Sequence, residues 1–90
     1  MDKITLDIET NMAHDTIWCC GVEYEDGTTE MHYAPDTLQS VIDEGYLVIG
    51  HNIIGFDAPV LKRVWGVDIE PTNLIDTLLM SRLYHPSVEG

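Results

Sequence analysis

A short segment near the start of the chain alternates apolar with polar residues, and this limits what the chain can fold into. Ile4, Leu6 and Ile8 recur at the period of a β-strand with one buried face. On that period Asp7 and Glu9 lie two residues apart and point to the opposite face. Two carboxylates held this close raise each other's pKa unless a cation lies between them. Alone, the pair is best explained as a solvent-exposed strand edge, but it is also a candidate site for Mg²⁺ or Mn²⁺.

The length and charge of the chain narrow its function. The 90 residues support one small domain, residues 1–90, and a hydrophobic content of 44% is enough for a core. The formal net charge is −12, with only 4 Lys and Arg. Nucleic-acid-binding proteins gain affinity by neutralising phosphates with basic residues. Any contact with nucleic acid therefore has to come through bound metal, or through basic surface that this chain lacks.

The sequence predicts a cytoplasmic protein. Cys19 and Cys20 are adjacent, and neighbours on a strand point to opposite faces, so they are poor partners for a disulfide. Free cysteines are typical of a reducing compartment. No signal peptide is visible, and no apolar run approaches the ~20 residues that a membrane span needs.

Two further strands are predicted after the first one. Residues 16–24 are rich in β-branched and aromatic residues, and Trp18 among them is expected in the core. The dipeptide Asp26-Gly27 is a strong hairpin signal, and residues 29–33 form the returning strand. The first three strands are therefore predicted to form an antiparallel meander.

A helix and a fourth strand follow. The helix starts at residues 35–37, where Asp36 or Thr37 can cap it, and it ends at Gly45. The continuous apolar run over residues 46–50 indicates a central strand that is buried on both faces. A strand, a helix and another strand predict a crossover onto the same sheet.

The rest of the chain contains two more acidic residues at predicted helix starts. Asp57, within residues 51–59, can cap the next helix, and taken alone this is the better explanation for it. Residues 72–75 are predicted as a short strand. Asp76 is interpreted as the cap of a last helix over residues 78–84.

Asp7, Glu9 and Asp57 are expected to meet at one edge of the sheet. Asp7 and Glu9 lie at the end of the first strand, and Asp57 lies just past the carboxyl end of the central strand. Sites in open α/β sheets gather beyond the carboxyl ends of strands. Three carboxylates at that edge have the chemistry of a two-metal phosphoryl-transfer site. Together with Asn52, this grouping favours metal binding over simple helix capping for Asp57.

The same residues resemble a known family. Residues 7–10 (Asp-Ile-Glu-Thr) resemble the first motif of the DEDD (DnaQ-like) 3′–5′ exonucleases, and residues 51–57 resemble their second motif. Residues 75–83 are similar to the segment that follows in proofreading domains of family A polymerases, especially those of T-odd podophages. The resemblance implies an RNase H-like α/β fold, of which this chain is the first part. Its mixed sheet would have the strand order three-two-one-four-five, with strand two antiparallel.

The resemblance also implies roles for the acidic residues. Asp7 would bridge two Mg²⁺ or Mn²⁺ ions, and Glu9 would bind the tighter ion and meet the terminal 3′-hydroxyl. Asp57 would hold the second ion through water. The implied reaction is attack of a metal-bound water on the last phosphodiester, which releases a nucleoside monophosphate.

Substrate-binding residues are implied in the same way. Asn52 would position the substrate or brace its loop, and Phe56 would contact the terminal nucleotides, although core packing is nearly as good an explanation for Phe56. Thr10 would line the terminal-nucleotide pocket together with Met12 and Ala13.

One part of the family pattern is missing. The third motif, a Tyr or His followed four positions later by an Asp, has no counterpart from Tyr84 onward. We therefore expect residues 1–90 to lack the third motif and to be a weak nuclease or none on their own. The missing portion would come from the remainder of a polymerase or from a self-associated copy.

Three functions follow from these observations. The first is the proofreading 3′–5′ exonuclease portion of a phage-like DNA polymerase, acting on single-stranded DNA 3′ ends in a bacterial or phage-infected cell. The second is a non-catalytic interaction module that docks on a polymerase or on itself. The third is an RNA-directed relative of the same superfamily.

Overall fold

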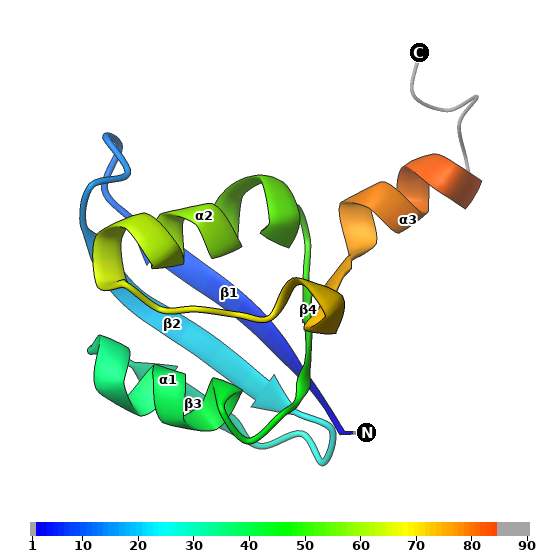
Figure 1. Cartoon of the computed structure of the whole chain (residues 1–90), viewed down its shortest axis with the longest axis horizontal. Coiled ribbons are helices and arrows are strands. Elements are labelled where there is room, and N and C mark those ends of the chain that lie inside the picture. Colours follow the sequence, from blue (N-terminus) through cyan, green and yellow to red (C-terminus); the bar gives the residue numbers. More distant parts are fainter. Residues whose placement is uncertain (1, 85–90) are drawn as a thin grey trace.

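The computed structural model describes residues 2–84 and shows one mixed five-stranded sheet with helices (Figure 1). The strand order is β3-β2-β1-β4-β5. The strands are β1 (Lys3–Thr10), β2 (Ile17–Tyr24), β3 (Thr29–His32), β4 (Leu47–Gly50) and β5 (Leu74–Asp76).

The direction of each strand agrees with the sequence prediction. β2 runs antiparallel to both β1 and β3, while β1, β4 and β5 are parallel to one another. The hairpin between β2 and β3 turns at Gly27, whose φ of 90° suits a residue without a Cβ. The Asp26 carboxylate accepts the backbone N–H of Thr28 at 2.9 Å and stabilises this turn. The predicted α/β class and RNase H-like strand order are confirmed.

Helical segments follow β3, β4 and β5. The helix α1 (Pro35–Ile42) joins β3 to β4. After β4, α2 (Ala58–Val60) lies between two wider π-type turns, so that residues 53–65 form one helical segment. A short 3₁₀ turn (Pro71–Asn73) leads into β5, and α3 (Thr77–Tyr84) projects away from the sheet (Figure 1).

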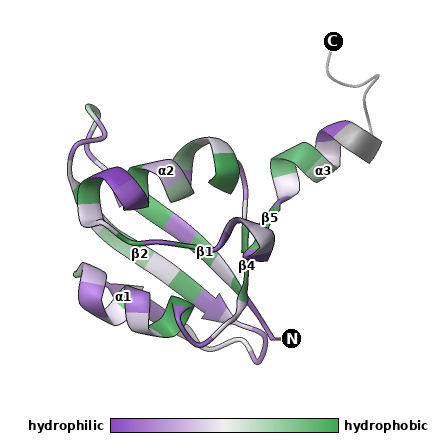
Figure 2. Ribbon diagram, viewed as in Figure 1, coloured by the Kyte–Doolittle hydropathy of each residue, from purple (hydrophilic) through white to green (hydrophobic). Residues whose placement is uncertain are grey.

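The core lies between one face of the sheet and the segments α1 and 53–65. Apolar and polar residues alternate along β1 and β2, as the ribbon colours in Figure 2 show, and the buried apolar ones form one cluster with residues of these helices. The core consists of Ile4, Leu6, Ile8, Ile17, Cys20, Val22, Leu38, Val41, Ile42, Val48, Ile53, Val60, Leu61 and Val67. Burial of these side chains is the main term that stabilises the sheet.

The opposite face of the sheet is open within residues 2–84. β1 presents Lys3, Thr5, Asp7 and Glu9 there, and all four side chains are exposed. The prediction that the fourth strand is buried on both faces is therefore wrong, because β4 alternates between half-buried and fully buried residues. Its apolar run reflects a face that no described part of the chain covers.

The start of α1 also differs from the prediction. Ala34 precedes the helix, and no side chain caps its first N–H groups. Pro35 occupies the first turn, where its missing N–H has no cost. Neither Asp36 nor Thr37 is the cap, and the Thr37 hydroxyl instead lies 2.8 Å from His32 Nδ1. Thr37 thereby links α1 to the edge strand β3.

Within residues 2–84, none of the helices combines the length and the apolar character that crossing a membrane requires.

Candidate active site

The first two candidate ligands lie at the carboxyl end of β1 on the open face. Asp7 pairs with Gly21 across the β1–β2 ladder, and Glu9 pairs with Cys19. The register shifts directly after Glu9, because Trp18 is an extra residue on β2 at this point. Such irregularities redirect side chains near the end of a strand. The predicted placement of Asp7 and Glu9 on the face away from the core is confirmed.

Asp57 reaches the same strand from residues 53–65. Its Oδ2 accepts the backbone N–H of Ile8 at 3.2 Å, and the side chain is only 5% exposed. β4 pairs with β1 only as far as Thr5, so the N–H of Ile8 has no strand partner on that side. A buried N–H needs an acceptor, and Asp57 supplies it. The gap between β1 and β4 therefore holds a carboxylate.

Asp57 is not a helix cap. The helical segment begins at Ile53, five residues earlier than predicted, so Asp57 lies within a helical turn and makes no capping hydrogen bond. Its carboxylate instead turns toward β1 and accepts the N–H of Ile8.

The site has the electrostatics of closely held acids. Burial raises the pKa of Asp57 to about 6, the N–H of Ile8 opposes this rise, and the charge of Asp7 adds to it. The same two carboxylates act on Cys20, whose pKa rises to about 12 mainly through burial. Asp7 and Asp57 therefore lie within electrostatic range of each other, although 49 positions separate Asp57 from the Ile8 N–H it binds.

The complete set of three ligands is not assembled. Within residues 2–84, no three His, Cys, Asp or Glu side chains are grouped so that they could hold a metal ion. The oxygen donors of Asp7, Glu9 and Asp57 suit Mg²⁺ or Mn²⁺ chemically. The convergence of Asp7, Glu9 and Asp57 on one metal site therefore stays a prediction. Residues 85–90, in which no third motif is found, lie outside the described residues.

The turn that leads to Asp57 depends on close approaches of the backbone. Asn52 has the left-handed conformation, with φ 59° and ψ 33°, which asparagine tolerates better than most residues. An added Cβ at Gly55 would lie 2.5 Å from Asn52 Oδ1, and one at Gly50 would lie 2.8 Å from Ile53 Cβ. The two glycines let this turn fold tightly against β4, which positions Asp57 one helical turn later.

Phe56 packs partly against the core and partly against the loop between β1 and β2. Its ring and the His14 ring form a T-shaped pair with centroids 4.8 Å apart. Arg63 Nη2 donates to the backbone oxygen of His14 at 2.7 Å. The loop is thus attached to the helical segment 53–65 at two points. Phe56 serves the packing role that was its alternative explanation, and this leaves the substrate role as a prediction.

The other predicted pocket residues lie at the end of β1 and in this loop. Thr10 is half-buried, and its Oγ1 donates to the backbone oxygen of Asn11 at 2.9 Å. Met12 is 98% exposed and Ala13 is exposed beside it, so neither lines a formed pocket within residues 2–84. The predicted contact of these residues with a terminal nucleotide stays a prediction.

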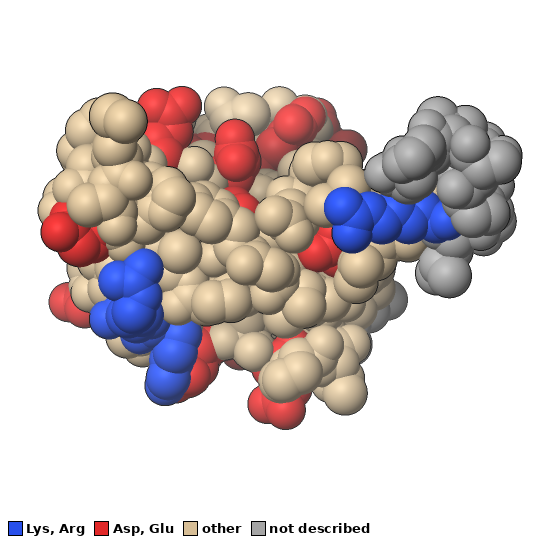
Figure 3. All heavy atoms as spheres, turned by 90° about the horizontal axis from the view of Figure 1, so that it is seen from above, with Lys and Arg blue, Asp and Glu red and all other residues tan. Residues whose placement is uncertain are grey.

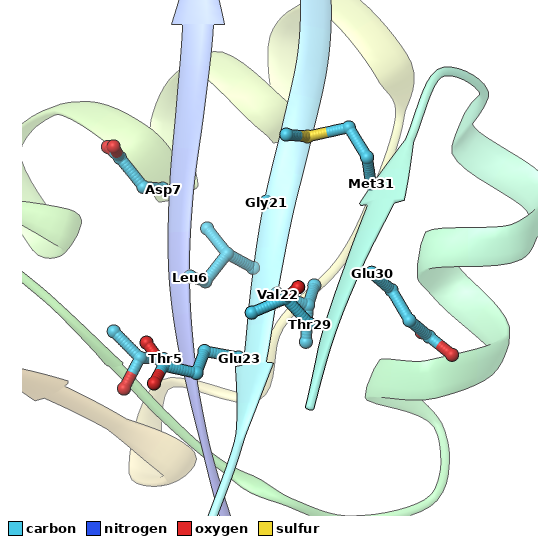
Figure 4. Close-up of a pocket in the computed structure, with 9 residues that line it drawn as sticks. All are labelled: Thr5, Leu6, Asp7, Gly21, Val22, Glu23, Thr29, Glu30 and Met31. Atoms are coloured by element: carbon cyan, nitrogen blue, oxygen red, sulfur yellow. The ribbon is translucent and has the colours of Figure 1, made fainter. Parts of the chain in front are cut away.

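A hollow of about 510 Å³ lies beside Asp7 on the open face. Gly21 forms its floor, and the side chain of Met31 reaches over this glycine from β3 (Figure 4). The side chain of Asp7 points away from both of them. Gly21 and Met31 belong to none of the motifs in the sequence, so they were not predicted as part of a site. The hairpin register could have found them, because Asp7, Gly21 and Met31 are paired in one row across three strands.

The surface is acidic with few basic groups. Figure 3 shows acidic side chains at several places on the visible face and basic side chains in small separate groups. Lys62 forms an ion pair with Asp68 at 2.7 Å, and Arg63 is engaged with the β1–β2 loop. Each of these two basic groups is thus engaged within residues 2–84.

Solved structures share this fold. The exonuclease domain of EXD2, in a crystal structure soaked in Mg and GMP, matches 97% of this chain and 50% of its own length with a TM-score of 0.68 at 17% identity. The family B DNA polymerase of the hyperthermophilic archaeon Pyrobaculum calidifontis matches 83% of this chain and 13% of its own length, with a TM-score of 0.59 at 18% identity. The fold is that of the DnaQ-like exonuclease domains.

Sequence comparison points to a particular branch of that class. The DNA-directed DNA polymerase of Escherichia phage T7 is 30% identical over 96% of this chain. That of Enterobacteria phage T3 is 31% identical over 92%. The chain spans 14% of the length of each polymerase. No family model matches the chain. The predicted resemblance to DnaQ-like exonucleases and to T-odd podophage polymerases is confirmed.

Proposed function

We propose that this chain is the N-terminal portion of a proofreading-type 3′–5′ exonuclease domain that acts on the 3′ end of single-stranded DNA. The observation that carries the proposal is the similarity to two phage DNA polymerases along nearly the whole chain. The buried Asp57 carboxylate, which accepts the N–H of Ile8 on β1 and whose pKa is raised in part by the charge of Asp7, supports it from the site.

In this proposal Asp7, Glu9 and Asp57 would hold Mg²⁺ or Mn²⁺. The metal would supply an activated water and charge stabilisation for phosphodiester hydrolysis. Other parts of the chain would orient the ligands and keep water out of the site. Asp57 is fixed by its hydrogen bond to β1, and Phe56 with the loop over residues 11–16 borders the site. Glu9 would complete the ligand set after a rotation of its side chain, or residues outside 2–84 would supply the missing ligand.

Metal binding is tested by thermal unfolding with Mn²⁺. At ten times the dissociation constant, Mn²⁺ stabilises a binding-competent chain by about 1.4 kcal/mol, which raises the melting temperature of a domain this size by several degrees. We expect Asp7→Ala to abolish the shift. Asp36→Asn, which removes the same charge from α1, is the matched control and should keep it. An identical shift in wild type and Asp7→Ala would contradict the proposed site.

Activity is tested on single-stranded DNA labelled at its 5′ end, with Mn²⁺ present. Because the third motif is absent from residues 1–90, we expect weak trimming or none from this chain alone. Robust trimming that Asp7→Ala abolishes would show that the chain needs no further residues. An RNA oligonucleotide of the same sequence separates a DNA-directed from an RNA-directed enzyme.

The second candidate function is a non-catalytic module that docks on a polymerase or on itself. The observation in its favour is the lack of a three-ligand cluster within residues 2–84. A folded chain whose melting temperature does not respond to Mn²⁺ would favour this function over the exonuclease.

A further inference from the structure

A second acid lies behind the candidate site. Asp76 is the last residue of β5 and pairs with Gly50 at the end of β4. Its side chain is 5% exposed and has no basic partner among its hydrogen bonds. A buried carboxylate in such a place requires several hydrogen-bond donors.

Backbone N–H groups from two separate segments supply these donors. Asp76 Oδ1 accepts from Asn52 at 2.9 Å, while Oδ2 accepts from Ile54 at 2.9 Å. Oδ1 also accepts from Leu78 at 2.9 Å and from Leu79 at 3.4 Å. Burial would raise the pKa of Asp76, but these four N–H groups outweigh it and lower the pKa below its ordinary value.

One carboxylate thus caps two helical segments. The contacts to Leu78 and Leu79 confirm the predicted cap of α3. The contacts to Asn52 and Ile54 cap the start of residues 53–65 from a different strand. This remote cap explains why the segment begins at Ile53 without a capping residue of its own.

The remote cap lies one turn before Asp57. It binds the N–H of Asn52, which has the left-handed conformation, and the backbone oxygen of Asn52 accepts the N–H of Phe56 at 2.9 Å. Asp57 follows Phe56 directly and reaches the N–H of Ile8. The path from the Asp76 carboxylate to the Asp57 carboxylate is therefore one continuous helical turn.

We propose that Asp76 is a positioning residue for the candidate metal site, which it sets by capping the turn that carries Asp57. The proposal rests on the proposed function. This role differs from the capping of α3. Asp76 would affect the metal affinity of the site although its own carboxylate does not bind the metal.

Three variants of the full chain separate position from charge and from capping. Asp76→Asn keeps one acceptor oxygen but places an amide against the N–H of Ile54. Asp76→Glu keeps the negative charge but moves both oxygens by one methylene. Asp36→Asn is the control that removes a charge far from the site. The measurements are the Mn²⁺ dissociation constant and the hydrogen exchange of the Ile54 and Leu78 amides.

We expect both Asp76 variants to bind Mn²⁺ at least about tenfold more weakly than wild type, as supporting residues of metal sites do when changed. In Asp76→Asn the Ile54 amide should exchange faster while the Leu78 amide keeps its protection. Asp36→Asn should bind Mn²⁺ within about twofold of wild type.

Other results overturn the proposal. Asp76→Glu with wild-type affinity would mean that only charge matters, and Asp76→Asn with a released Ile54 amide and wild-type affinity would mean that the cap does not set the site. If Asp76→Asn does not fold, Asp76→Glu decides between these outcomes. Wild-type chain that binds no Mn²⁺ would overturn the proposed function itself, and the positioning role with it.

Discussion

At the level of single residues, Asp57 is a carboxylate that folding makes harder to ionise. Its carboxylate is buried beside Asp7 and receives one backbone N–H, so the charged form is destabilised and its pKa rises to about 6. A pKa raised on folding means that the folded state binds the proton more tightly than the unfolded state. The resulting stability is fully present below the unfolded pKa of about 3.9 and is lost as the pH rises through 6.

This gives a prediction for Asp57→Asn in the absence of metal. The amide keeps an oxygen for the N–H of Ile8 but carries no charge, so the variant should be more stable than wild type by up to about 3 kcal/mol at pH 7.5. The difference should shrink toward zero near pH 4. Denaturant unfolding of both proteins at several pH values measures it. A difference that does not change with pH would contradict the assigned cause.

The two adjacent cysteines should differ sharply in reactivity. Cys20 is fully buried, and its pKa of about 12 leaves almost no thiolate at neutral pH. Cys19 is only partly buried. We expect a thiol reagent such as iodoacetamide to label about one cysteine per native chain and both after denaturation, with mass spectrometry locating the label. Rapid native labelling of Cys20 would show that the region opens.

At the level of secondary-structure elements, two strand glycines should respond oppositely to alanine. A Cβ at Gly50 would lie 2.8 Å from Ile53 Cβ and 3.2 Å from the backbone oxygen of Leu6, neither of which can move freely. A Cβ at Gly21 would have its nearest contact at 3.8 Å. Gly50→Ala should therefore cost about 1–3 kcal/mol, whereas Gly21→Ala should be neutral or slightly stabilising. Denaturant unfolding compares them, and equal losses would contradict the close approach at Gly50.

The elements that could be predicted from the sequence are those specified locally. The alternation along residues 4–9 predicted β1 and its exposed acids, and Asp26-Gly27 predicted the hairpin. The start of the helix at Ile53 could not be predicted, because its cap is supplied by Asp76 from another strand. Trp18 was expected in the core but is 59% exposed, since it is the extra residue at the strand irregularity.

The candidate site divides in the same way. Periodicity and the position past a strand end were enough to nominate Asp7 and Asp57. The hydrogen bond to Ile8 was not predictable, because it depends on how far β4 runs beside β1, and that distance is set by tertiary packing. The hollow under Met31 likewise depends on a face that residues 2–84 leave uncovered.

At the level of the whole molecule, the net charge of −12 predicts how DNA binding depends on conditions. Few basic groups means few released counterions, so the affinity for single-stranded DNA should change by less than about tenfold between 50 and 200 mM salt. We expect binding to require Mn²⁺ or Mg²⁺ and to disappear with a chelator. Fluorescence anisotropy of a labelled oligonucleotide measures this. Tight binding that persists in the chelator would contradict the metal-mediated contact.

The long reach of the Asp57 and Asp76 hydrogen bonds has a consequence for biosynthesis. Asp57 binds an N–H that lies 49 positions earlier, and Asp76 caps N–H groups that precede it by 24 and 22 positions. During translation, residues 52–57 are therefore synthesised well before Asp76, which caps their turn. The turn can be capped only after codon 76 has been translated, so a chain truncated before residue 76 should lack the hydrogen bonds that fix the start of the helical segment 53–65.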